Sequence, residues 1–146
     1  MKVVYNACHG GFSLSHKAML RIAELKGVKL WPQKDERFRS IESYTYWTVP
    51  PDKWVKELSP GEWSKLSVAE RQAHNVKWEG KTVDWVRDIK RSDPQLVQAV
   101  EELGDEANGA HAVLRVAEVH GKYHITEYDG YESVETPDDI DWEEAQ

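Results

Sequence analysis

The stretch that decides the fold of this chain is Val3-Val4-Tyr5-Asn6-Ala7-Cys8-His9-Gly10-Gly11-Phe12-Ser13-Leu14-Ser15, which runs on into residues 16–27. It predicts a strand over residues 2–7, a loop with two glycines, and a helix that begins after Ser13 or Ser15 and ends at Gly27. Leu14, Ala18, Ile22 and Leu25 recur at helical spacing and form the expected core face. Backbone N–H groups and the helix dipole favour an anion at such a helix start, so the loop is the first candidate for a ligand site.

The next part of the chain predicts short elements rich in aromatic residues. A strand at 28–31 would complete an N-terminal strand-helix-strand unit, and the polar residues 32–42 read as a loop. Alternating β-forming residues predict a strand at 43–49. A capping box predicts a helix at 68–77, and a short strand is expected at 83–86.

The C-terminal part predicts a helix followed by an antiparallel β-meander. Asp93 and Pro94 predict the start of a helix, and Gly104 predicts its end. Residues 112–134 alternate as strands do, and Asp129-Gly130 is a strong signal for a two-residue hairpin turn. The predicted fold class is therefore α+β, with a strand-helix-strand unit, a Trp-rich middle, and a helix plus meander.

Charge and composition narrow the class of protein. The chain has 146 residues and a net charge of −7, of which the twelve residues 135–146 carry six acids and no base. We expect one domain over residues 1–136, an acidic tail over 137–146, and no nucleic-acid polymer as partner, because the remainder is almost neutral. One cysteine, no signal peptide and no long apolar run predict a cytoplasmic protein with no membrane partner.

The tryptophans are concentrated in the middle of the chain. Six of the seven lie between residues 31 and 85, and a small domain buries that many indoles with difficulty. Some are expected in a groove or at a subunit contact, with Tyr46 and Trp47 as candidates for stacking on a base. The alternative is aromatic packing in a loop-rich segment.

The loop after the first strand lacks the established nucleotide motifs, since neither a Walker A ending nor the dinucleotide glycine spacing is present. What it offers is backbone N–H groups and small polar side chains. Arg91 could pair with a phosphate, and Tyr131 is a further candidate from the hairpin. The loop candidates are Asn6, Gly10, Gly11, Phe12, Ser13 and Ser15. The alternative is a tight turn whose glycines serve packing alone.

A catalytic reading centres on Cys8 and His9. Adjacent residues of a strand point to opposite faces, so His9 is a poor base for Cys8, and no other histidine is identified by spacing. No metal-ligand spacing is present, and neither a metal nor a cofactor is expected.

The pattern Val-x-Asn-x-Cys-x-Gly-Gly-Phe-x-Leu-Ser of residues 4–15, followed by Glu-Leu-Lys-Gly at 24–27, resembles a widespread family of small phage and prophage proteins. The resemblance continues through residues 46–51, 66–75 and 91–109 and ends with Glu-Tyr-Asp-Gly at 127–130. It departs in the acidic tail, where such proteins carry a basic-aromatic ending. The resemblance implies a relation to the anti-CBASS nucleotide sponges, which act as oligomers.

The leading hypothesis is a phage-encoded, non-catalytic homo-oligomer in the host cytoplasm. It would bind a small nucleotide immune signal, such as a cyclic oligonucleotide, and block anti-phage defence by sequestering it. One alternative is an inhibitor that binds a host defence protein through its Trp-rich or acidic surface. Another is a small hydrolase or transferase that depends on Cys8.

Overall fold

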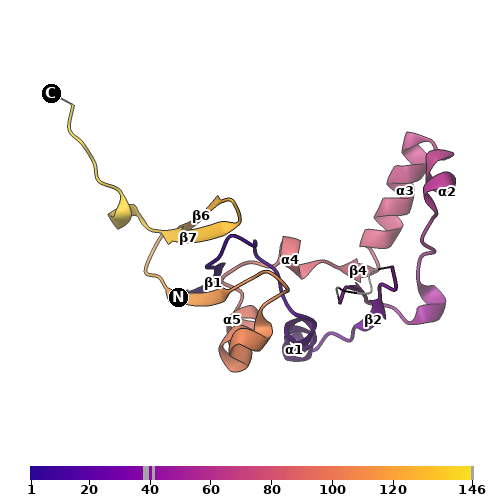
Figure 1. Cartoon of the computed structure of the whole chain (residues 1–146), viewed down its shortest axis with the longest axis horizontal. Helices are drawn as coiled ribbons and strands as arrows, with labels where there is room; N and C mark the ends of the chain where they lie inside the picture. The colour runs from indigo at the N-terminus through magenta and orange to yellow at the C-terminus, as the bar shows by residue number, and fades with distance from the viewer. Residues whose placement is uncertain (38–39, 41, 146) are drawn as a thin grey trace. The chain divides into compact units, whose positions relative to one another are not determined.

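The computed structural model describes residues 1–37, 40 and 42–145, and its contacts divide the chain into two compact units (Figure 1). The first unit combines Met1–Gly27 with Trp85–Gln146, and the second is Val28–Asp84. Helices and antiparallel strands in small sheets confirm the α+β class. The expectation of one domain over 1–136 stays a prediction beside this division. None of the described helices is long and apolar enough to cross a membrane.

The first unit is built on a two-stranded sheet and two helices. Strand β1 (Lys2–Asn6) pairs antiparallel with β5 (Leu114–Glu118), and Val4 lies opposite Val116. Helices α1 (His16–Lys26) and α5 (Pro94–Leu103) pack on each other and supply most of the core. Several core side chains are fully buried, among them Val4, Ala18, Ile22 and Leu96. The helix α4 (Trp85–Asp88) is short.

The ends of both core helices lie where the local sequence predicts. The Ser15 side chain accepts a hydrogen bond from the third helical residue of α1, and Gly27 ends that helix in the left-handed conformation. Asp93 caps α5, and Gly104 ends it. These predictions are confirmed because each one rests on hydrogen bonds within a single helical turn.

The hairpin of strands β6 (His124–Tyr128) and β7 (Tyr131–Glu135) is also confirmed. Asp129 and Gly130 form its turn with φ of 49° and 84°, the two positive values that such a turn requires. The strand β5 does not pair with its sequence neighbour β6. It pairs with β1 instead, so β5 belongs to one sheet and β6 and β7 form another.

The strand-helix-strand order at the N-terminus is present, but its two strands belong to different sheets. Strand β2 (Trp31–Lys34) pairs with β3 (Tyr44–Trp47), which in turn pairs with β4 (Thr82–Val83). The strand predicted at 28–31 thus begins three residues later, at Trp31, and extends into the predicted loop at 32–42. Residues 38, 39 and 41 of that loop lie outside the described part of the chain.

The second unit packs around an indole cluster. Trp47 is 1 % exposed, and its ring lies against those of Trp54 and Trp78 at centroid distances of 5.4 and 4.7 Å. Helices α2 (Pro60–Ser64) and α3 (Val68–Glu79) each begin with a capping box. The strand predicted at 83–86 is replaced by β4 and the start of α4.

The acidic tail is exposed over its described residues. It contains one 3-10 turn, Pro137–Asp139, in which Asp139 accepts hydrogen bonds from the backbone and hydroxyl of Thr136. The last residue of the predicted tail, 146, lies outside the described residues.

Candidate functional site

The loop from β1 to α1 is held by close backbone packing at its glycines. A Cβ atom on Gly10 would overlap the carbonyl oxygen of His111, and one on Gly130 would overlap that of His9. Gly11 adopts a φ of 86°, which other residues rarely adopt. Only glycine at these positions permits the hairpin turn and the backbone of His111 to approach the loop this closely.

Asn6 is the central polar group of this packing. It is fully buried, and its Nδ2 donates to the carbonyl oxygens of Cys8 at 2.7 Å and Gly130 at 2.9 Å. Its Oδ1 accepts from the backbone N–H of Val113 at 2.8 Å. The amide of Asn6 is therefore engaged in fixing the loop, and its contact with a ligand stays a prediction.

Arg91 is also engaged inside the protein. Its guanidinium donates to both carboxylate oxygens of Glu132, at 2.6 and 2.9 Å, and lies 3.5 Å from the ring centroid of Phe12. Glu132 also accepts from the backbone N–H of Asn6 at 2.8 Å. Arg91 and Phe12 thus contact each other inside the protein, and their predicted roles in ligand binding stay predictions.

Glu132 is the residue that sequence reasoning missed. Its side chain is 9 % exposed although it lies on a hairpin strand of alternating exposure. Nothing local distinguishes it from the neighbouring acids, since its partners come from β1 and from the segment before α5.

The two serines of the loop contact the segment 106–109 rather than a ligand space. The Ser15 hydroxyl donates to the carbonyl oxygen of Glu106 at 2.6 Å and also caps α1. Ser13 lies directly against Gly109, whose backbone N–H donates to the Ser13 carbonyl at 3.2 Å. Both serines therefore have a structural role, and their role in anion binding stays a prediction.

The remaining free polar groups of the loop are backbone N–H groups. His9 and Gly10 are exposed, and within the described part of the chain their N–H groups donate no hydrogen bond. Successive N–H groups in a turn form a concavity that attracts anions. The N–H groups of Gly11 and Phe12 likewise donate no hydrogen bond among the described residues, but these two residues are only half exposed, so His9 and Gly10 are the exposed donors of the loop.

A hollow of about 330 Å³ lies where this loop meets the hairpin. The rings of His9 and Tyr131 form one side, with centroids 5.4 Å apart, and Tyr128 is 80 % exposed beside them. Tyr131 is the predicted site residue that the structure brings next to the loop. The hollow is lined by His9, Thr126, Glu127, Tyr128, Tyr131 and Ser133.

Cys8 lacks the surroundings of a nucleophile. Its Sγ donates to the carbonyl oxygen of His111 at 3.0 Å and lies 3.4 Å from Asn6 Oδ1. The neighbouring His9 places Nδ1 3.2 Å from the carbonyl oxygen of Asp129 instead. Among the described residues, no imidazole hydrogen-bonds to the thiol and no group of three or more acidic, His or Cys side chains is arranged to hold a metal.

Tyr46 and Trp47 belong to the second unit, whereas the other eight predicted site residues belong to the first. Trp47 has Trp54 stacked on it, Trp78 at its edge, and its Nε1 donates to Gln33 at 2.9 Å. It is a core residue with no ring face for a base, which corrects the prediction. Burial raises the pKa of the Tyr46 hydroxyl.

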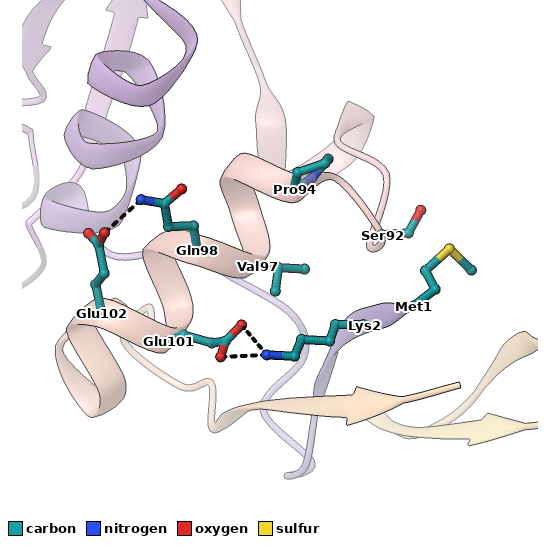
Figure 2. Close-up of a pocket in the computed structure, with 8 residues that line it drawn as sticks. All are labelled: Met1, Lys2, Ser92, Pro94, Val97, Gln98, Glu101 and Glu102. Atoms are coloured by element: carbon teal, nitrogen blue, oxygen red, sulfur yellow. Dashed lines mark hydrogen bonds and ion pairs between the residues drawn. The ribbon is translucent and has the colours of Figure 1, made fainter. Parts of the chain in front are cut away.

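A larger hollow of the first unit lies elsewhere, between the start of β1 and α5, and measures about 550 Å³ (Figure 2). Its Lys2 is paired with Glu101 at 2.9 and 3.1 Å, while Glu102 pairs with Arg21 at 2.7 Å. Hydrogen bonding to Arg21 lowers the pKa of Glu102 to about 2, so this carboxylate stays ionised. The charges of this lining are paired within the protein and its residues include no aromatic ring, so we assign the candidate site to the smaller hollow beside the loop.

The chain matches no model of a known protein family, no curated protein and no solved structure.

Proposed function

We propose that this chain is a non-catalytic phage protein of the host cytoplasm that binds a small nucleotide immune signal and sequesters it. The observation that carries the proposal is the hollow beside the loop, which the rings of His9 and Tyr131 line, since His9 also begins the exposed pair of loop residues His9 and Gly10. Rings that stack on bases and N–H groups that hold phosphates are the two components that a nucleotide site needs. The phage origin is supported by the resemblance of the loop and hairpin sequences.

The lining of the hollow suggests how a nucleotide would lie. A base would stack on Tyr131 or Tyr128, and a phosphate would accept from the N–H groups of His9 and Gly10. Glu127 uses Oε1 to accept from the backbone N–H of Gly130, which leaves Oε2 to accept from a ribose hydroxyl. A volume of about 330 Å³ is at the lower end for small-molecule sites, so it suits one nucleotide unit per chain.

Sequestration rather than turnover is supported by the way the loop is fixed. Asn6 and Glu132 hold the loop and the hairpin turn together without any ligand. A binding loop that is already ordered loses less entropy on binding, which favours tight retention. The Cys8 thiol is half-buried and donates to the backbone carbonyl of His111.

The test is calorimetry of the full chain against cyclic dinucleotides, cyclic trinucleotides and ADP-ribose derivatives. Binding should weaken by about 5- to 150-fold in Tyr131→Ala, the range that loss of one base stack produces. Trp142→Ala removes an aromatic ring that is 81 % exposed in the tail and should bind as the wild type does. Failure of every ligand to bind the folded protein would refute the proposal.

Chromatography of the bound ligand separates a sponge from an enzyme. The ligand recovered after denaturation should be chemically unchanged, and the Cys8→Ser variant should bind it with the same affinity. A converted ligand, with conversion lost in Cys8→Ser, would favour the catalytic alternative instead.

A second candidate function is inhibition of a host protein through the acidic tail. Trp142 and Ile140 are 81 % and 44 % exposed among acidic residues, which suits a basic and apolar surface on a partner. A pull-down from host lysate should then fail for a chain that ends at Glu135 and for Trp142→Ala, while nucleotide binding is retained.

A further inference from the structure

Helix α3 of the second unit is covered on one face only. Arg71, His74 and Trp78 recur at helical spacing and are its half-buried residues. Arg71 Nε donates to the carbonyl oxygen of Trp63 at 3.2 Å, and the His74 ring lies 5.8 Å from the Trp63 ring. Helix α2, which carries Trp63, therefore lies along this face, as the two ribbons show in Figure 1.

The opposite face of α3 is apolar and exposed. Val68 and Val76 are each 69 % exposed, the highest values for aliphatic side chains in the described chain. At 3.6 residues per turn, Ala69, Gln72 and Ala73 lie between them on the same face. Among the described residues of the second unit no element covers this apolar face, which makes it a candidate contact surface.

The charges at the two ends of α3 indicate what fits this face. Lys65 precedes the helix and Glu79 ends it, and neither has an ion-pair partner among the described residues. Glu70 lies in its first turn and Lys77 in its last. Two copies of α3 placed antiparallel bring Lys65 of one copy toward Glu79 of the other, whereas a parallel pair would align like charges.

The apolar residues of α3 fit the same antiparallel arrangement. An antiparallel pair centred on Gln72 places Val68 of one copy opposite Val76 of the other, and the two Gln72 amides opposite each other. Ala69 and Ala73 have small side chains that let the two backbones approach. We propose that this face of α3 binds the same face of a second copy of this chain, antiparallel, in a two-fold dimer.

The size of the contact sets its strength. A helix of 12 residues is about 18 Å long, so one helix pair buries less than the roughly 1,200 Å² typical of a stable interface. The dimer is therefore weak, with a dissociation constant of about 10 µM to about 1 mM.

Sedimentation velocity of the full chain tests the proposal directly. The wild type should shift from monomer to dimer with concentration, and Val76→Glu should remain monomeric because the charge has no partner. The matched control is Leu20→Glu, which changes a 40 % exposed leucine of α1 and should dimerise as the wild type does. Circular dichroism verifies that both variants are folded.

A charge exchange then tests the antiparallel arrangement. Lys65→Glu and Glu79→Lys should each weaken self-association by about tenfold, because both symmetric pairs become repulsive. An equimolar mixture of the two variants should associate as well as the wild type, since each copy now presents the charge that the other needs. A wild type that stays monomeric at about 1 mM, a dimer that tolerates Val76→Glu, or a mixture that fails to associate would overturn the proposal.

Discussion

Removing the Glu132 carboxylate should destabilise the first unit more than removing any other acid of the hairpin. The carboxylate accepts three hydrogen bonds, two from the Arg91 guanidinium and one from the backbone N–H of Asn6. In Glu132→Ala the guanidinium and the N–H lose these acceptors while the rest of the packing remains. Breaking a buried pair costs about 3–5 kcal/mol.

The exposure of the two partners fixes where in this range the loss should lie. Glu132 is 9 % exposed and Arg91 is 21 % exposed, so water can partly reach the orphaned guanidinium. We therefore expect a loss of about 3 kcal/mol, at the lower end of the range. With a urea slope of about 2 kcal/mol per molar, the midpoint would fall by about 1.5 M.

The assay is urea unfolding of the full chain by circular dichroism, with amide hydrogen exchange of β1 and α5 reporting on the first unit separately. Glu135→Ala is the control on the same strand, since this exposed acid bonds only to exposed side chains of β6 and should leave the midpoint unchanged. Arg91→Met keeps an apolar chain over Phe12, and its combination with Glu132→Ala should be about 1–3 kcal/mol less damaging than the sum of the two. Additive effects, or a Glu132→Ala loss no greater than that of the control, would refute the reasoning.

Three further outcomes are expected. Gly130→Ala should destabilise the hairpin turn by about 2 kcal/mol or more and accelerate its amide exchange, because the new Cβ overlaps the carbonyl oxygen of His9 and the φ of 84° strains any side chain. Burial acts to raise the pKa of Asp93, but hydrogen bonds from Lys26 and from backbone N–H groups outweigh it and hold the pKa below its ordinary value. Asp93 therefore stabilises the folded state above its unfolded pKa of about 3.9, and Asp93→Asn should reduce the loss of stability on acidification below that pH in an acid titration by circular dichroism. Trp47→Ala should cost about 3–5 kcal/mol and unfold the second unit, seen as a red shift of the tryptophan emission and loss of exchange protection in β3.

The outcome for the candidate site shows where sequence reasoning ends. Ser15 was a predicted ligand residue and a predicted helix cap, and only the second role is confirmed. The capping role follows from the next three residues of the chain, whereas the other partner of its hydroxyl is Glu106, far along the sequence. Arg91 and Trp47 were selected as chemically suitable for phosphates and bases, but each meets an internal partner that no local pattern reveals.

The sequence by itself determined what short-range physics controls. It determined the ends of α1 and α5 and the Asp129-Gly130 hairpin, because caps and turns depend on the conformational preferences of a few adjacent residues. The tertiary structure alone decided that β1 pairs with β5, and that Asn6, Arg91 and Glu132 form one buried cluster. Those groups lie tens of residues apart, so their hydrogen bonds form only after the chain has closed long loops around a common core. The loop that the sequence presents as an anion seat is consequently held by packing against the hairpin, and the hollow between them is the site that we propose for a ligand.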